Sequence, residues 1–401
     1  MRAADAPAVR ATLLGDWPGT DPVSAAGDVL NALGSPHLPV LPELPARGPG
    51  SDPVGRTAAL LEDLAVDLQP HGWRLVPEPG MDHRRATSAL ASDRHALTDV
   101  AGESGLSLED LLLRVTGPMS LAADLWLPGG ERSLSDHGAR RDVAQSLAAG
   151  LASHVAAVRS QTGASRLTVV LEEPRAAAVL SGALPTASGY RTVRSIPRSE
   201  VRSAWTLLLQ SVLDAGATGL VLAPGRRGAG ADWAWAELAL LASEALPPLA
   251  SEGGTRSATG DANGDGSGDQ HGEGAAPMTA LALPLAPLEG PEADPSRWEV
   301  VAGWTEAGRH VAVRLPAPEH VGTPVAPQPA GTAAVRPYRG AAVGLARAWE
   351  RLGLDPARLG QLILAAPDLS AGTRVQANRT VEATVAAAEE LDRIRQDGGL
   401  A

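Results

Sequence analysis

The chain has 401 residues, 44% of them hydrophobic, which is enough to bury a large core in one domain or two. The formal net charge of -12 disfavours nucleic acid or an anionic membrane as a partner. The absence of Cys excludes disulfides, thiolate nucleophiles and Cys-ligated metals. There is no apolar run long enough to span a membrane and no signal-peptide block at the N-terminus, so we expect a cytoplasmic protein.

Short apolar runs alternate with longer amphipathic segments along the chain. The short runs have the length of buried strands. In chain order they are Thr12–Gly15, Leu38–Leu41, Leu112–Thr116, Leu167–Leu171, Gly219–Ala223, Thr279–Leu285, His310–Leu315 and Gln361–Ala366, with Trp73–Val76 as a further candidate. Segments with apolar residues three or four positions apart predict helices at Arg56–Gln69, Ser135–Ser160, Glu200–Ala215, Ala231–Leu246, Ala341–Gly353 and Arg379–Gln396.

This alternation of strands and helices is typical of parallel βαβ units. About eight such units predict an α/β fold of the (β/α)8 TIM-barrel type, formed as a single domain over residues 1–401. A doubly wound open sheet is the alternative. It is less favoured because no glycine-rich dinucleotide turn follows the first predicted strand.

The segment 251–275 differs from the rest of the chain in composition. It contains almost no large apolar residue, so burial cannot offset the entropy of ordering it. We therefore predict a flexible, low-complexity insertion in the barrel. Part of it, Asp261 to Asp269, resembles the start of a calcium-binding loop. Gly272 stands where such a loop needs a bidentate Glu, so a solvated linker is favoured.

Active sites of (β/α)8 barrels lie at the carboxyl ends of the strands, where this chain places several acidic residues. Most carboxylates at strand ends cap a helix or face water, so a structural role is the alternative to a functional role for each of these residues. Because neighbouring strand residues point to opposite faces, only one of the adjacent Glu172 and Glu173 can face the barrel mouth. The Gly117-Pro118 turn opens a helix whose free N–H groups could hold an anion.

Several motifs in a fixed order carry a resemblance to a known family. They read "LGDWPGTDP", "LPELPARGPG", "VTGPMSLAA", "VVLEEPRAAAVLSGALPTASGY" and "LAAPDLSAG". In this order they resemble actinobacterial proteins related to the C-terminal barrel of cobalamin-independent methionine synthase. That barrel belongs to a superfamily with uroporphyrinogen decarboxylase.

The resemblance implies transfer of a methyl group from a methylfolate to the thiol of homocysteine or a related thiol. In the family a zinc ion activates the thiol and is bound by His, Cys and Glu residues. The corresponding positions here, in Val221–Pro224, Ala280–Leu288 and at Leu369, carry none of these ligands. We therefore expect no metal and no cofactor at this site, and a small molecule as the partner.

The resemblance also implies roles for individual residues. It assigns catalytic roles to Glu172 and Asp368, and substrate binding to Asp16, Thr20, Glu43 and Glu172. We hypothesise that Glu172 faces the mouth and contacts a cationic group. Glu173 would point away and anchor a neighbouring strand or helix.

Two other functions remain open at this point. One is a non-catalytic or repurposed barrel that binds an amino acid or a folate-like ligand without activating a thiol. The other is a metal-free enzyme closer to the decarboxylases, in which Arg47 and Arg56 would bind substrate carboxylates, since Arg can pair with a carboxylate through two nitrogens.

Overall fold

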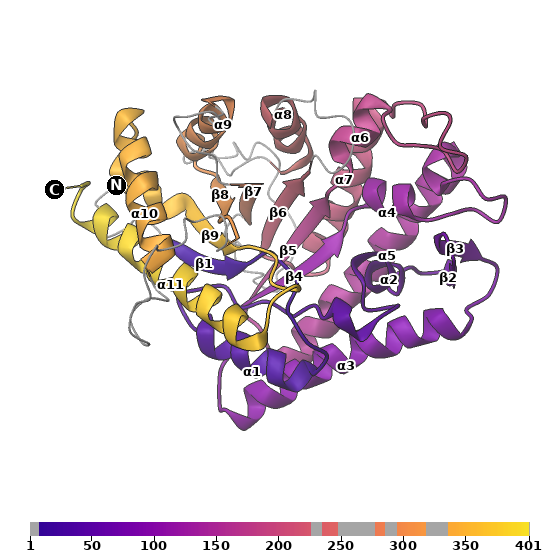
Figure 1. Cartoon of the computed structure of the whole chain (residues 1–401), viewed down its shortest axis with the longest axis horizontal. Helices are drawn as coiled ribbons and strands as arrows, with labels where there is room; N and C mark the ends of the chain where they lie inside the picture. Colours follow the sequence, from indigo (N-terminus) through magenta and orange to yellow (C-terminus); the bar gives the residue numbers. More distant parts are fainter. Residues whose placement is uncertain (1–7, 226–234, 248–276, 285–294, 318–335, 401) are drawn as a thin grey trace, which may run out of the picture.

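A curled sheet of parallel strands forms the centre of the computed structural model, which describes residues 8–225, 235–247, 277–284, 295–317 and 336–400 (Figure 1). Within these residues seven strands pair in the order β1-β9-β8-β7-β6-β5-β4. Their bounds are β1 Arg10–Leu13, β4 Asp110–Thr116, β5 Arg166–Glu173, β6 Gly219–Pro224, β7 Met278–Pro284, β8 His310–Arg314 and β9 Leu362–Ala366. They are mostly continuous runs of buried Leu, Val and Ala, as expected when helices cover a parallel sheet.

The segment from His37 to Leu41 closes this sheet into a barrel. On one side the Leu38 amide donates to the Ala11 carbonyl of β1 at 2.9 Å. On the other, the Leu41 amide donates to the Leu112 carbonyl of β4 at 3.0 Å, and Val40 forms a parallel bridge with Leu112. The predicted strand at Leu38–Leu41 thus occupies the eighth barrel position, and the predicted (β/α)8 fold is confirmed.

Helices follow the strands and surround the sheet (Figure 1). The longer ones are α1 Pro22–Ala32, α3 Met81–Glu103, α5 His137–Thr162, α7 Arg198–Asp214, α8 Trp235–Ala245, α9 Pro295–Glu306, α10 Arg336–Arg351 and α11 Arg374–Gln396. The short ones are α2 Pro53–Ala58, α4 Pro118–Asp124 and α6 Ala176–Ser181. Local sequence sets their starts: Asp136 accepts the Ala139 amide at the N-terminus of α5, and Thr373 forms a capping box with Gln376 before α11.

The predicted helix at Arg56–Gln69 is wrong. Helix α2 already ends at Ala58, and β2 (Ala65–Gln69) pairs antiparallel with β3 (Gly72–Val76) outside the barrel. Asp63 lies between α2 and β2 with a positive φ of 59°, which an α-helix cannot contain. The leucines three or four positions apart lie in the turn after α2, in the loop before β2 and in β2 itself, an arrangement that periodicity alone cannot distinguish from a helix.

The same periodicity missed several helices. The largest is α3, which is Ala-rich and buries only a few of its residues, so its apolar stripe is weak. The insertion predicted at 251–275 lies outside the described residues, and the single-domain organisation stays a prediction. None of the helices in the described ranges is both long enough and apolar enough to cross a membrane.

Candidate functional site

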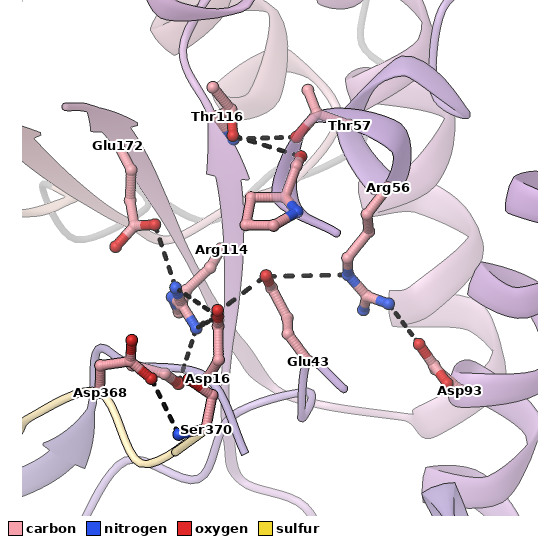
Figure 2. A network of polar contacts seen from close by, with 12 residues as sticks. Asp16, Glu43, Arg56, Thr57, Asp93, Arg114, Thr116, Glu172, Asp368 and Ser370 are labelled. Carbon is pink, nitrogen blue, oxygen red and sulfur yellow. Dashed lines mark hydrogen bonds and ion pairs between the residues drawn. The ribbon is translucent and has the colours of Figure 1, made fainter. Parts of the chain in front are cut away.

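A cavity of about 330 Å³ lies at the carboxyl ends of the barrel strands. Its polar lining brings together residues far apart in the sequence, from the ends of β1, β4, β5, β8 and β9. They are Asp16, Arg114, Thr116, Glu172, Arg314 and Asp368. This is the barrel mouth, where enzymes of this fold place their sites, and Figure 2 shows most of these side chains.

Glu172 projects into this cavity and is held by two arginines. Its Oε2 lies 3.1 Å from Nη2 of Arg114, and its Oε1 lies 2.6 Å from Nη2 of Arg314. Burial by itself would raise the pKa of Glu172, but the two guanidinium groups outweigh it and lower the pKa. Glu172 therefore faces the mouth as an anion, and its cationic partners belong to the protein itself.

Glu173 points to the opposite face of β5 and is fully buried. It accepts hydrogen bonds from the Met119 amide at 3.0 Å, the Ser120 amide at 2.7 Å and Nε1 of Trp205 at 2.9 Å. Burial raises the pKa of Glu173, although these donors oppose the shift. The helix start after Gly117-Pro118, which the sequence suggested as an anion site, thus already holds the carboxylate of Glu173. This residue anchors α4 to β5.

Arg114 is the centre of the polar network at the mouth, and the sequence analysis did not single it out. Besides Glu172, it donates to the Gly15 carbonyl at 2.7 Å and to Oδ1 of Asp16 at 3.2 Å. Oε2 of Glu43 lies 4.0 Å away. Burial disfavours the charged guanidinium, but three surrounding carboxylates raise the pKa of Arg114. The signal in the sequence was an arginine inside the apolar strand "DLLLRVT", where a charge needs buried partners.

Asp16 and Asp368 form the acidic side of the cavity. Burial raises the pKa of Asp16, the charge of Arg114 opposes this, and the charges of Asp368 and Glu172 add to the rise. Asp368 is exposed, and its Oδ1 accepts the Ser370 amide at 2.9 Å. The two segments approach closely, because a Cβ on Gly15 would lie 2.4 Å from the Asp368 backbone. Glycine at this position is what lets the ends of β1 and β9 meet.

The remaining predicted residues lie away from the cavity. Glu43 is buried behind it, between Arg114 and Arg56, whose Nε is 3.7 Å from the Glu43 carboxylate. Burial raises the pKa of Glu43, and the two arginines offset part of the rise. Thr20 is exposed and is not among the residues that line the cavity.

The two arginines considered for a decarboxylase-like site also lie elsewhere. Arg47 and Arg56 both pair with Asp93 of α3, Arg47 at 2.7 Å. Arg56 is itself buried, and Figure 2 shows its contact with Asp93. Their charge is therefore used inside the protein. The cations that do line the mouth are Arg114 and Arg314.

The residues at the mouth do not fit the zinc site that the resemblance implies. The end of β6 presents Ala223 and Pro224, and Leu369 is buried beside Asp368. These side chains offer no ligand atom for zinc. In the described part of the chain no group of three or more His, Cys, Asp or Glu residues is arranged to hold a metal ion.

Comparisons with known proteins add general similarities of shape. No protein-family model matches the chain, and no curated protein matches it. Among solved structures, a B12-independent methionine synthase from Shewanella sp. W3-18-1, in complex with selenomethionine, shares 10% identity at a TM-score of 0.47, covering 96% of this chain and 97% of that one. A pyruvate carboxylase from Rhizobium etli shares 12% identity at a TM-score of 0.32, covering 100% of this chain and 32% of that one. The fold assignment rests on the strand order and the closing hydrogen bonds.

Proposed function

We propose that the protein binds a small charged molecule, an amino acid or a folate-like compound, at the barrel mouth. The observation that carries this proposal is the convergence of Asp16, Glu172, Asp368 and Arg314 on one cavity of about 330 Å³. Cavities of this size accommodate small metabolites, and a few well-placed charged groups orient them. The proposal keeps the cytoplasmic location expected from the sequence.

The charged side chains around the cavity differ in how many of their binding partners the protein itself supplies. Arg114 is buried and surrounded by carboxylates. Arg314 has 38% of its side chain exposed, and among the described residues its carboxylate partner is Glu172, so it can also bind a ligand carboxylate. Asp368 is exposed and binds one backbone amide, so its carboxylate can receive a ligand ammonium group. A molecule with both groups suits this pair.

The experiment is calorimetric titration with a panel of amino acids, including homocysteine and methionine, and with 5-methyltetrahydrofolate. Replacing Arg314→Met or Asp368→Asn should weaken binding about tenfold or more, because each removes a charge-assisted contact. Arg374→Met is the matched control, since Arg374 pairs with Asp28 on the outer surface. If no member of the panel binds, or if the control weakens binding equally, the proposal fails.

Methyl transfer from a methylfolate to homocysteine or a related thiol is a second candidate. It is supported by the order of the motifs and by the meeting of Asp16, Glu172 and Asp368 at one mouth. These residues would hold and orient the amino acid, whereas the side chains at the expected ligand positions leave no route through zinc. Methionine formation from homocysteine and 5-methyltetrahydrofolate tests it. If homocysteine binds but no methionine forms, methyl transfer is excluded and the function in ligand binding remains.

A further inference from the structure

A second, much smaller cavity lies outside the barrel wall, among β4, α2, α3 and α5. The cavity has a volume of about 10 Å³, so it accepts one water molecule or one ion of similar size. Leucine and valine side chains form much of its wall. Its polar lining consists of Arg56, Thr57, Arg114 and His154, and no carboxylate lines it.

Three of these residues have hydrogen-bond donors to spare. Nδ1 of His154 lies 3.2 Å from Nη1 of Arg94, and because a guanidinium only donates, the imidazole proton is on Nε2. Thr57 Oγ1 accepts the Thr116 amide at 3.0 Å, which leaves its hydroxyl hydrogen to donate. Arg56 uses Nη1 for Asp93 and Nε for Glu43 (Figure 2). For Nη2 of Arg56 and Nε2 of His154 the described residues provide no partner.

Two guanidinium groups line this cavity, and no carboxylate does. The carboxylates that pair with Arg56 and Arg114 belong to Asp93, Glu43, Asp16 and Glu172, which lie outside the lining. Arg56 and His154 are more than nine-tenths buried. Donors that are buried without a partner cost free energy, and an anion in contact with them would supply the missing acceptor.

We propose that this cavity binds a small monovalent anion, such as chloride, held by Arg56, Thr57 and His154. A water molecule needs acceptors for its own two hydrogens, and these side chains offer donors instead. An anion only accepts hydrogen bonds, so it matches them better. The size of the cavity admits a single-atom anion and excludes nitrate, sulfate and phosphate. This site is separate from the barrel mouth and does not depend on the ligand proposed there.

Thermal unfolding of the full chain in sodium chloride and in sodium gluconate at equal ionic strength tests the proposal. Chloride binds the folded state alone, so raising it from about 10 to about 200 mM should raise Tm by about 1–3 °C more than gluconate does. His154→Leu removes one donor and should abolish this difference. His95→Leu, at an exposed histidine of α3, should preserve it.

Crystals of the unmodified protein grown in bromide provide the second measurement. The expected result is an anomalous peak in contact with Arg56 and His154. This measurement does not depend on whether the His154 variant folds. Equal melting curves in chloride and gluconate, together with no bromide peak, would mean that the cavity holds water only and would overturn the proposal. A chloride effect that persists in His154→Leu, with no bromide peak in the cavity, would place the ion elsewhere and overturn it as well.

Discussion

The two faces of β5 carry adjacent glutamates into regions that bind a carboxyl group in different ways. On the outer face, the fully buried Glu173 has three N–H donors of the chain around its carboxylate. On the inner face, Glu172 pairs with Arg114 and with Arg314, whose side chain is 38% exposed. The carboxyl group of Glu173 already has its hydrogen-bond partners within the protein and contributes to stability, whereas the mouth can still bind another molecule. A binding site therefore differs from a structural ion pair because its charged groups can still bind a further partner, and not because they are charged.

Removing each glutamate in turn tests this difference most strongly. Glu173→Ala leaves the Met119, Ser120 and Trp205 donors buried without an acceptor, so we expect a loss of about 3–5 kcal/mol in the free energy of unfolding. Glu172→Ala should cost about 1–2 kcal/mol, because Arg114 keeps Asp16 as a partner. Urea unfolding measures both. Equal losses would contradict the assignment of Glu173 to stability and Glu172 to the site.

Gly117→Ala probes the space around Glu173. A Cβ on Gly117 would lie 2.4 Å from Oε1 of Glu173, which is closer than atoms can approach, so the carboxylate or α4 must shift. We expect a loss of about 2–3 kcal/mol, and a smaller one when Glu173→Ala is already present. Gly129→Ala is the control, because nothing lies near a Cβ there. If Gly117→Ala were as harmless as its control, the tight packing of Glu173 on α4 would be wrong.

Acid should destabilise the protein through buried histidines outside the mouth. Burial, aided by Arg56 and Arg94, lowers the pKa of His154 to about 3, and burial with Arg10 lowers that of His310 to about 4. The unfolded chain binds these protons near the ordinary histidine pKa, so their stabilising effect is complete above about pH 6.5 and is lost as pH falls towards 4. At pH 5 we expect a loss of about 2 kcal/mol for each residue.

Unfolding curves between pH 8 and pH 4 for the unmodified protein and for His154→Gln check this expectation. The variant should lose part of the slope of stability against pH, whereas His95→Gln, at an exposed position, should retain all of it. An unchanged slope in His154→Gln would mean that this histidine is not held neutral in the folded state.

The sequence predicted the barrel well because its signals are local. Buried strands such as Leu112–Thr116 and Leu167–Leu171 stand out as apolar runs, and Asp136 marks the start of α5. The segment at Leu38–Leu41 was also identified, although it makes little regular pairing. Its role in closing the barrel depends on hydrogen bonds to β1 and β4, which no local pattern contains.

The site was predicted less completely, since it depends on contacts between distant residues. Alternation on β5 predicted that only one of Glu172 and Glu173 faces the mouth, and the family resemblance selected Glu172. The resemblance also selected Asp16 and Asp368, which line the cavity. The partners of Glu172 could not be foreseen, because Arg114 and Arg314 lie 58 and 142 positions away in the sequence. Arginines inside β4 and β8 were the available clue. A buried arginine on a barrel strand requires carboxylates nearby.

Asp368→Asn should have the smallest effect on stability, and in the opposite direction. The charge of Asp368 repels that of Asp16, and its side chain accepts one backbone amide, a hydrogen bond that asparagine can still form. Removing its charge should therefore leave unfolding unchanged or raise the free energy of unfolding by up to about 0.5 kcal/mol, a gain that shrinks at high salt. Urea unfolding at low and high ionic strength measures this. A loss comparable to that of Glu173→Ala would show that Asp368 is a structural residue, and the contrast between the mouth and the outer face of β5 would no longer hold.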